Sequence, residues 1–192
     1  MAPSSDPALG ILELTSIARG VVVCDAMAKK APIRILQSHP VSPGKHVVVV
    51  AGGVAEVEEA MAAGIAAAGA TLVDRLLLPQ AHGQLAPLVA AGTAPPEPAR
   101  ARSLDSVAVF ETFTICATVL AADAAAKAAD VTLVEMRLGV GLGGKGFFTM
   151  SGRLESVEAA ALAGQGAIDS GLLVGVEIIP APHEDLRKRL ML

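Results

Sequence analysis

The sequence repeats itself at an offset of about 100 residues. Residues 8–32 (ALGILELTSIARGVVVCDAMAKKAP) are similar to residues 106–130 (SVAVFETFTICATVLAADAAAKAAD), and the similarity continues along each half. Matched pairs include Glu13 and Glu111, Asp25 and Asp123, Lys29 and Lys127, Gly44-Lys45 and Gly144-Lys145, and His82 and His183. Repetition on this scale indicates that one small domain was duplicated, and it predicts two like domains in tandem.

The composition favours a globular protein that associates with itself. Hydrophobic residues make up 53% of the 192 residues and charged residues 18%, which excludes a disordered chain. Aromatic residues are only 2% and the net charge is −4, so the chain lacks the stacking platforms and basic groove of a nucleic-acid binder. So many small apolar side chains with so few charges predict that part of the apolar surface is covered by another subunit, as in a homo-oligomer.

The sequence shows no membrane or secretion signal. No apolar run reaches the roughly 20 residues that a membrane-spanning helix needs, and the N-terminal MAPSSDP lacks the basic start and apolar centre of a signal peptide. We therefore expect a soluble, cytoplasmic protein. Cys24 and Cys116 occupy non-equivalent places on apolar helical stretches and are interpreted as small buried hydrophobic residues.

Apolar periodicity and breaker residues predict the same order of elements in both halves, namely strand, helix, strand, strand, helix, strand. This is the split βαβ arrangement of ferredoxin-like domains, an α+β fold. In the first half the predicted strands are 9–14, 33–37, 47–51 and 71–78, and the predicted helices are 16–30, capped by Ser16, 54–68, and a short one within 82–89. In the second half the predicted strands are 106–111, 131–137, 147–151 and 172–179, and the predicted helices are 114–128, 154–169 and a terminal one from about His183. The Pro-rich segment 92–105 is interpreted as a linker between a first domain, 1–91, and a second domain, 106–192.

The connection between the second and third strands differs between the halves. In the first half it is SHPVSPGK, residues 38–45, whose prolines and glycine predict a loop. In the second half it is Gly-rich, and the run from Gly139 to Lys145 fits the start of a phosphate-binding loop. That motif needs Ser or Thr after its lysine and a helix behind it, whereas Gly146 and the strand-like FFTMSG follow here. We therefore predict no nucleotide site and interpret the glycines as permitting positive φ angles and close backbone approach.

The histidines do not form a recognisable catalytic or metal-binding set. His39 and His46 flank the first loop and are interpreted as solvated rim residues, with a role in a pore as the alternative. His82 and His183 follow the fourth strand of each half, where a structural cap or an inter-subunit hydrogen bond is expected. The sequence contains neither HExxH nor GxSxG, so it predicts neither an enzyme nor a metal protein.

Two further pairs are repeat-equivalent. Glu13 and Glu111 lie on the first strand of each half and are interpreted as carboxylates that accept backbone hydrogen bonds, rather than as a catalytic acid pair. Lys29 and Lys127 lie at matching helix ends, where they are either solvated charges or contacts between subunits.

The residues also carry a family resemblance. The runs ALGILELTSIARG and DAMAKKA, the half-repeat ADAAAKAA, the strand-ending PAPHEDL and the Gly-rich RLGVGLGGKGFF resemble bacterial microcompartment shell proteins of the tandem-domain class, over about residues 8–190. The resemblance implies a flat homotrimer with pseudo-sixfold symmetry that tiles with hexameric and pentameric shell proteins. It also implies a structural role, not catalysis, in a shell that lies in the cytoplasm.

In that family the loops between the second and third strands line a central pore, through which small polar metabolites would cross. The resemblance therefore places six residues at the axis: Val41, Ser42, Pro43, Gly141, Leu142 and Gly143. It assigns four residues to contacts at the edge of the tile: Lys29, Lys127, His82 and His183.

The resemblance also bears on cofactors. Tandem-domain members from propanediol-using compartments carry a cysteine at the position of Ser42, and three such cysteines hold an iron–sulfur cluster. Serine offers no thiolate, so we predict no cluster and no other cofactor. The alternative function is a trimeric ferredoxin-like regulator that binds a small ligand between subunits.

Overall fold

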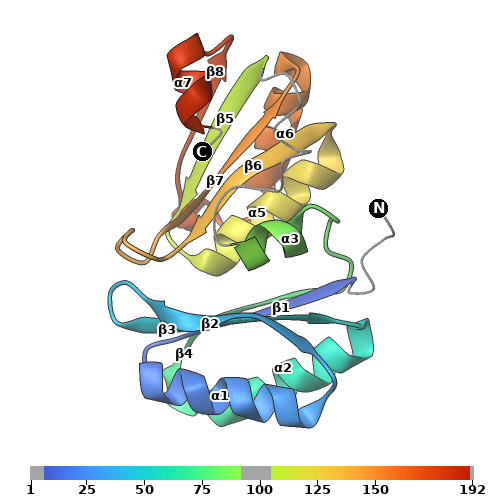
Figure 1. Cartoon of the computed structure of the whole chain (residues 1–192), viewed down its shortest axis with the longest axis vertical. Coiled ribbons are helices and arrows are strands. Elements are labelled where there is room, and N and C mark those ends of the chain that lie inside the picture. Colours follow the sequence, from blue (N-terminus) through green and yellow to red (C-terminus); the bar gives the residue numbers. More distant parts are fainter. Residues whose placement is uncertain (1–6, 92–104, 191–192) are drawn as a thin grey trace. The chain divides into compact units, whose positions relative to one another are not determined.

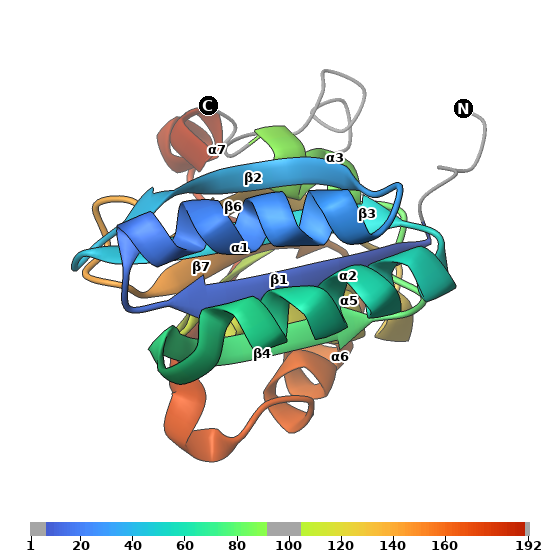
Figure 2. The same cartoon turned by 90° about the horizontal axis from the view of Figure 1, so that it is seen from below.

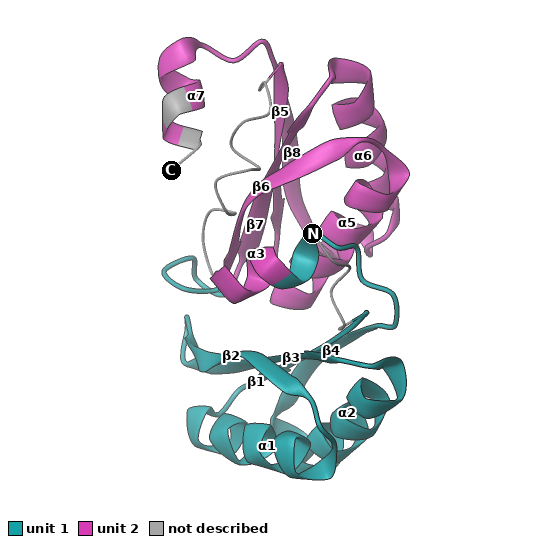
Figure 3. Cartoon of the chain, turned by 45° about the vertical axis from the view of Figure 1, so that its right-hand side comes forward, with its two compact units in different colours: residues 1–86, 139–144 teal, residues 87–138, 145–192 magenta. Residues whose placement is uncertain are grey.

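The computed structural model describes residues 7–91 and 105–190 (Figure 1). Two compact units make up the chain: residues 1–86 with 139–144, and residues 87–138 with 145–192 (Figure 3). Most of the predicted linker, residues 92–104, lies outside the described residues, as does the N-terminal segment 1–6.

Both halves of the chain fold in the predicted order. The first half contains β1 (Ala8–Leu14), α1 (Ile17–Lys30), β2 (Arg34–Val41), β3 (Lys45–Gly52), α2 (Val54–Ala68), the 3₁₀ turn η1 (Gly69–Thr71), β4 (Leu72–Leu78) and α3 (Leu85–Ala91). The second half contains β5 (Ser106–Thr112), α5 (Ile115–Ala128), β6 (Val131–Leu138), β7 (Gly146–Gly152), α6 (Leu154–Gly166), the 3₁₀ turn η2 (Ser170–Leu172), β8 (Leu173–Pro180) and α7 (Glu184–Leu190).

Each half forms one antiparallel four-stranded sheet. The strand orders are β2-β3-β1-β4 and β6-β7-β5-β8, so the first strand of each copy lies between the third and the fourth. In the first unit α1 and α2 run side by side across one face of the sheet (Figures 1 and 2). The predicted α+β class and the tandem ferredoxin-like arrangement are therefore confirmed.

Local sequence explains where the first helix of each half begins. The side chain of Ser16 accepts a hydrogen bond from the backbone N–H of Arg19 at 3.2 Å, and that of Thr114 accepts one from Ala117 N–H at 3.1 Å. A hydroxyl at this position satisfies one of the backbone donors that the first helical turn leaves unpaired. The prediction that Ser16 caps its helix is confirmed.

Two predicted boundaries were wrong. Strand β2 does not end at residue 37 but continues to Val41, with Pro40 paired opposite His46. A proline is tolerated there because β2 is an edge strand, which needs its backbone donors on one side only. Helix α6 ends at Gly166 rather than residue 169, after two glycines that weaken its last turn.

The cores consist of small aliphatic side chains. In the first unit the residues that pack together include Leu12, Val23, Met27 and Val50, all without exposed surface. In the second unit the rings of Phe110 and Phe148 stack with centroids 5.0 Å apart. Full burial of each large apolar side chain contributes about 1.5–3 kcal/mol to folding. Cys24 and Cys116 are buried, as predicted.

Candidate functional site

The first predicted pore loop is shorter than the sequence suggested. Because β2 reaches Val41, only Ser42, Pro43 and Gly44 connect it to β3. Val41 is buried, Ser42 is partly exposed and Pro43 is exposed, so the loop presents the last two to its surroundings. Gly44 has φ +77°, a conformation that favours glycine.

The second predicted loop, residues 139–144, also presents its tip to solvent. Gly141 and Gly143 are exposed and Leu142 is partly exposed. Val140, with 62% of its surface exposed, is more accessible than Leu142 and was not among the predicted pore residues.

The two loops meet within the first unit. The backbone N–H of Ser42 donates a hydrogen bond to the carbonyl oxygen of Gly139 at 3.2 Å. A Cβ on Gly144 would lie 3.1 Å from the carbonyl oxygen of Ser42, so glycine is needed where the backbones approach. The structure thus brings together the two sets of residues that the sequence placed at one feature.

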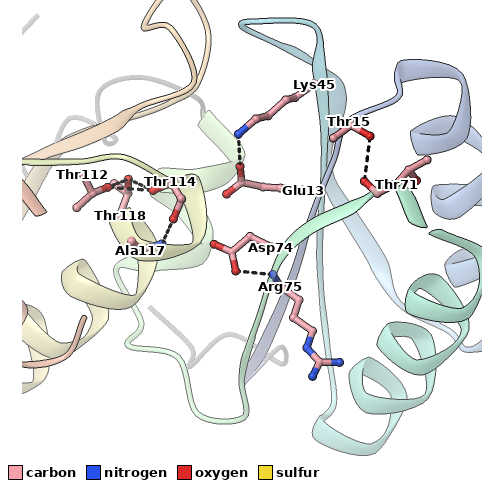
Figure 4. Close-up of polar contacts among 10 residues, drawn as sticks. All are labelled: Glu13, Thr15, Lys45, Thr71, Asp74, Arg75, Thr112, Thr114, Ala117 and Thr118. Atoms are coloured by element: carbon pink, nitrogen blue, oxygen red, sulfur yellow. Dashed lines mark hydrogen bonds and ion pairs between the residues drawn. The ribbon is translucent and has the colours of Figure 1, made fainter. Parts of the chain in front are cut away.

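A lysine at the foot of each loop pairs with a glutamate on the neighbouring strand. Lys45 Nζ lies 3.7 Å from Oε2 of the fully buried Glu13 (Figure 4), and Lys145 donates a hydrogen bond to Glu111 Oε1 at 3.0 Å. Each glutamate lies opposite the residue two positions after its lysine, namely Val47 for Glu13 and Phe147 for Glu111, so glutamate and lysine are diagonal neighbours. Lys45 begins β3, whereas Lys145 directly precedes β7. The prediction that these carboxylates accept backbone hydrogen bonds was wrong for Glu111, whose partner is a side chain.

His46 is not the solvated rim residue that the sequence predicted. It is 2% exposed, and its Nε2 lies 3.0 Å from the hydroxyl oxygen of Ser38. Its Nδ1 is buried and has no hydrogen-bond partner among the described residues. Burial, and to a smaller extent the charge of His39, lowers the pKa of His46 below its ordinary value. The sequence could not reveal this, because the space for the ring is created by Gly20 on another element.

The second unit fills the equivalent place with threonines. The hydroxyl oxygens of Thr112 and Thr118 lie 2.7 Å apart, and both are within hydrogen-bonding distance of the carbonyl oxygen of Thr114, at 2.9 and 3.0 Å (Figure 4). With two hydroxyl protons, two of these three contacts are donated at a time. Gly146, which matches His46 in the repeat, leaves room for Thr118. The two domains are therefore packed differently beneath their loops.

The predicted edge lysines lie near the ends of α1 and α5. Lys29 donates to Asp25 at 2.6 Å, and Lys127 donates to Asp123 in the equivalent pair. Each pair joins residues four apart on one helix. Asp123 is buried whereas Asp25 is exposed. A contact of these lysines with other subunits stays a prediction.

His82 and His183 act as caps, one of the two roles expected for them. His82 Nδ1 accepts a hydrogen bond from the backbone N–H of Gln84 at 3.4 Å, and His183 Nδ1 accepts one from Asp185 N–H at 3.3 Å. Both bonds stabilise the turn that leads into the following short helix, α3 or α7. Their predicted place at a tile edge is a separate matter and stays a prediction.

Comparison with known proteins agrees with this arrangement. The family model of the BMC domain matches the chain twice, at residues 8–81 and 106–182. The bacterial microcompartment shell protein PduT of Citrobacter freundii is 38% identical over 188 residues, which cover 96% of this chain and 97% of that protein. The carboxysome assembly protein CcmO of Synechococcus elongatus is 28% identical and covers 98% of this chain and 70% of that protein.

A solved structure shows the same fold. A microcompartment protein from Desulfitobacterium hafniense superposes with a TM-score of 0.86 at 39% sequence identity, covering 94% of this chain and 98% of that one. Among the described residues, no helix is both long and apolar enough to cross a membrane.

Proposed function

Because the chain belongs to the BMC domain family and carries that domain twice, we propose that it is a structural shell component of a bacterial microcompartment. The observation that carries this proposal is the 38% identity to a microcompartment shell protein over 96% of the chain, with both domains matched. The function is assembly and selective permeation, with no catalytic step, and the protein resides in the shell.

The exposed face of α1 supports a homotrimer. Val21 is 59% exposed, with Ile17 and Val22 beside it on the same helix at 42% and 49%. In the repeat Val21 corresponds to Val119 on α5, which has no exposed surface. A closed ring in which first and second domains alternate would bury the α1 face, and three copies complete such a ring of six domains. Hexameric and pentameric shell proteins are then its neighbours in the shell.

The adjoining loops support a pore at the axis of that trimer. Ser42, Pro43, Gly141 and Gly143 present a hydroxyl, a proline ring and backbone groups, which suits the passage of small polar metabolites. Threefold symmetry repeats each of these groups around the opening. Lys29 and Lys127, with His82 and His183, then face neighbouring tiles at the outer edge.

Two measurements on the full chain test this function. Sedimentation equilibrium should give a trimer, and electron microscopy at high protein concentration should show hexagonally packed sheets. The alternative regulator would stay a discrete trimer that forms no sheets and binds a small ligand between subunits. No feature of the described residues favours that alternative. A monomer at all concentrations would rule out both.

A further inference from the structure

His46 lies near the end of two strand ladders. It pairs with Leu14 in the last pair between β1 and β3, and with Pro40 in the last pair but one between β2 and β3. Only Val41 and Lys45 pair beyond it, before the loop 42–44. The ends of a ladder open more easily than its centre, so the hairpin tip, residues 38–46, can separate while the rest of the sheet stays paired.

The site of the His46 ring suits only the neutral imidazole. The residue is 2% exposed, its Nε2 contacts the Ser38 hydroxyl, and its buried Nδ1 has no hydrogen-bond partner among the described residues. A neutral imidazole can leave Nδ1 without a proton, whereas an imidazolium carries an N–H on both ring nitrogens. Protonation in place would therefore bury a charged donor that has no acceptor.

The groups packed around the ring also disfavour a positive charge. On β2, Ser38 contacts the ring and His39 adds positive charge. On α1, Gly20 lies against the ring, and the residue before it is Arg19. Burial and His39 together lower the pKa of His46, in agreement with this geometry.

The carboxylate of the neighbouring strand lies on the other face of the sheet. Glu13 and Lys45 alternate with Leu14 and His46 along β1 and β3, so the two pairs of side chains project in opposite directions. Lys45 Nζ lies 3.7 Å from Glu13 Oε2. Glu13 therefore pairs with a lysine on its own face and does not compensate a charge on His46.

The second domain has the same hairpin without a titrating ring. Leu138 stands opposite Gly146, as Pro40 stands opposite His46. The Thr118 hydroxyl occupies the space that a Cβ on Gly146 would need. A threonine does not change its charge in mild acid, so this hairpin serves as a control within the same chain.

We propose that the hairpin tip is a proton-operated switch: when His46 takes up a proton, its ring leaves the site beside Gly20 and residues 38–46 detach from α1. The inference rests on the proposed function only for its consequence, which is that mild acid changes the conformation of the loop 42–44 in the assembled shell. The switch itself lies within one domain. It can therefore be measured whether or not the trimer forms.

Hydrogen exchange of the full-length protein, followed by mass spectrometry, tests the switch. Each exchange rate is divided into the intrinsic rate at the same pH, which gives a protection factor. Protection of segment 38–46 should fall about tenfold between about pH 7.5 and about pH 5.5, because the released histidine has a pKa of about 6.5. The equivalent segment 137–147 and the central strands β1 and β5 should keep their protection.

Three variants decide the role of the proton. His46→Phe has no titrating group and should show the same protection of segment 38–46 at both pH values. His39→Glu replaces a charge that opposes the imidazolium with one that favours it, so it should reduce the fall in protection. His82→Gln, which removes a histidine of the same unit outside the hairpin tip, should leave the fall unchanged. If His46→Phe does not fold, His39→Glu and the second hairpin still decide the matter.

The outcomes separate the switch from the shell function. A fall in protection that is equal in segments 38–46 and 137–147, or that persists in His46→Phe, would overturn the switch and leave the shell function standing. A fall confined to segment 38–46 in a protein that forms neither trimers nor sheets would support the switch and refute the shell function.

Discussion

Gly20 on α1 and His46 at the start of β3 share one space, since a Cβ on Gly20 would lie 2.3 Å from ring carbons of His46. In the second unit the glycine and the larger residue have exchanged places. Thr118 stands at the helix position and Gly146 on the strand, where a Cβ would lie 2.1 Å from the Thr118 hydroxyl oxygen. Each domain therefore combines one glycine with one larger polar residue, but on opposite elements.

The exchange makes a prediction about stability. Gly20→Ala should destabilise the protein by about 1–3 kcal/mol through overpacking against His46, even though alanine is the better helix former. The denaturant midpoint measures this. The double variant with Gly20→Thr and His46→Gly, which copies the second unit, should recover much of the loss. The control is Gly83→Ala, because the added Cβ there meets nothing within 4 Å. An unchanged denaturant midpoint for Gly20→Ala would contradict the close packing of Gly20 against His46.

Burial of His46 predicts a loss of stability in mild acid. Its pKa in the folded protein is lowered, first by burial and then by His39, so the unfolded chain binds the proton more readily. The stabilisation is complete above the unfolded pKa of about 6.5 and is lost as the pH falls from there towards the folded value. The denaturant midpoint should therefore drop between about pH 7.5 and pH 5.5.

A substitution isolates this effect. His46→Phe fills the same space without a titrating group and should flatten the pH dependence. His183→Gln changes an exposed histidine and should not. An unaltered pH profile in His46→Phe would assign the acid sensitivity to other groups. Two groups act directly on the His46 ring: the Ser38 hydroxyl contacts it, and His39 adds positive charge. Two further charged residues lie nearby in sequence: Lys45 precedes His46 on β3, and Arg19 precedes Gly20 on α1.

The exposed apolar face of α1 predicts how the trimer can be broken. Val21→Asp should shift the protein from trimer to monomer, because the proposed interface would bury an unpaired charge. Its effect on the monomer fold should be small, since Val21 is already 59% exposed. Sedimentation velocity measures the change. Leu162→Asp, at a still more exposed apolar position on α6, is the matched control, and loss of the trimer in both variants would argue against a specific α1 interface.

The edge lysines predict a separation of trimer formation from sheet formation. Lys29→Ala removes an exposed helical ion pair, which contributes only about 0.3–0.5 kcal/mol to stability. Lys127→Ala removes the partner of the buried Asp123 and should lower the melting temperature more. We expect the trimer to persist in both variants, with a nearly unchanged melting temperature in Lys29→Ala, while the hexagonal sheets disappear in electron micrographs. Intact sheets in the double variant would show that these residues are solvated helix-end charges.

The place of Ser42 can be tested by chemistry. If Ser42 surrounds the axis, Ser42→Cys creates three converging thiols that can take up an iron–sulfur cluster after anaerobic reconstitution. Visible absorption and iron content per trimer measure this. Thr15→Cys, an exposed hydroxyl outside the loops, is the control. A colourless, iron-free Ser42→Cys trimer would place the residue away from the axis.

The duplicated domain, the order of elements along the chain and most helix boundaries could be predicted before the structure was known. They could be predicted because they depend on signals local in the chain: apolar periodicity over α1, the hydroxyl of Ser16 at the start of a helix, and the matched residues Asp25 and Asp123. The glycine-rich loop was also predicted correctly as a loop that runs into a strand.

The contacts beneath and beside the loops could not be predicted in this way, because they form between distant parts of the chain. The continuation of β2 through Pro40 depends on pairing with β3, and the burial of His46 depends on the missing side chain of Gly20. The pairing of Glu13 with Lys45 and of Glu111 with Lys145 joins residues more than 30 positions apart. Contacts of this kind arise from the space and charge that other elements present, and a single sequence does not specify them until the chain is folded.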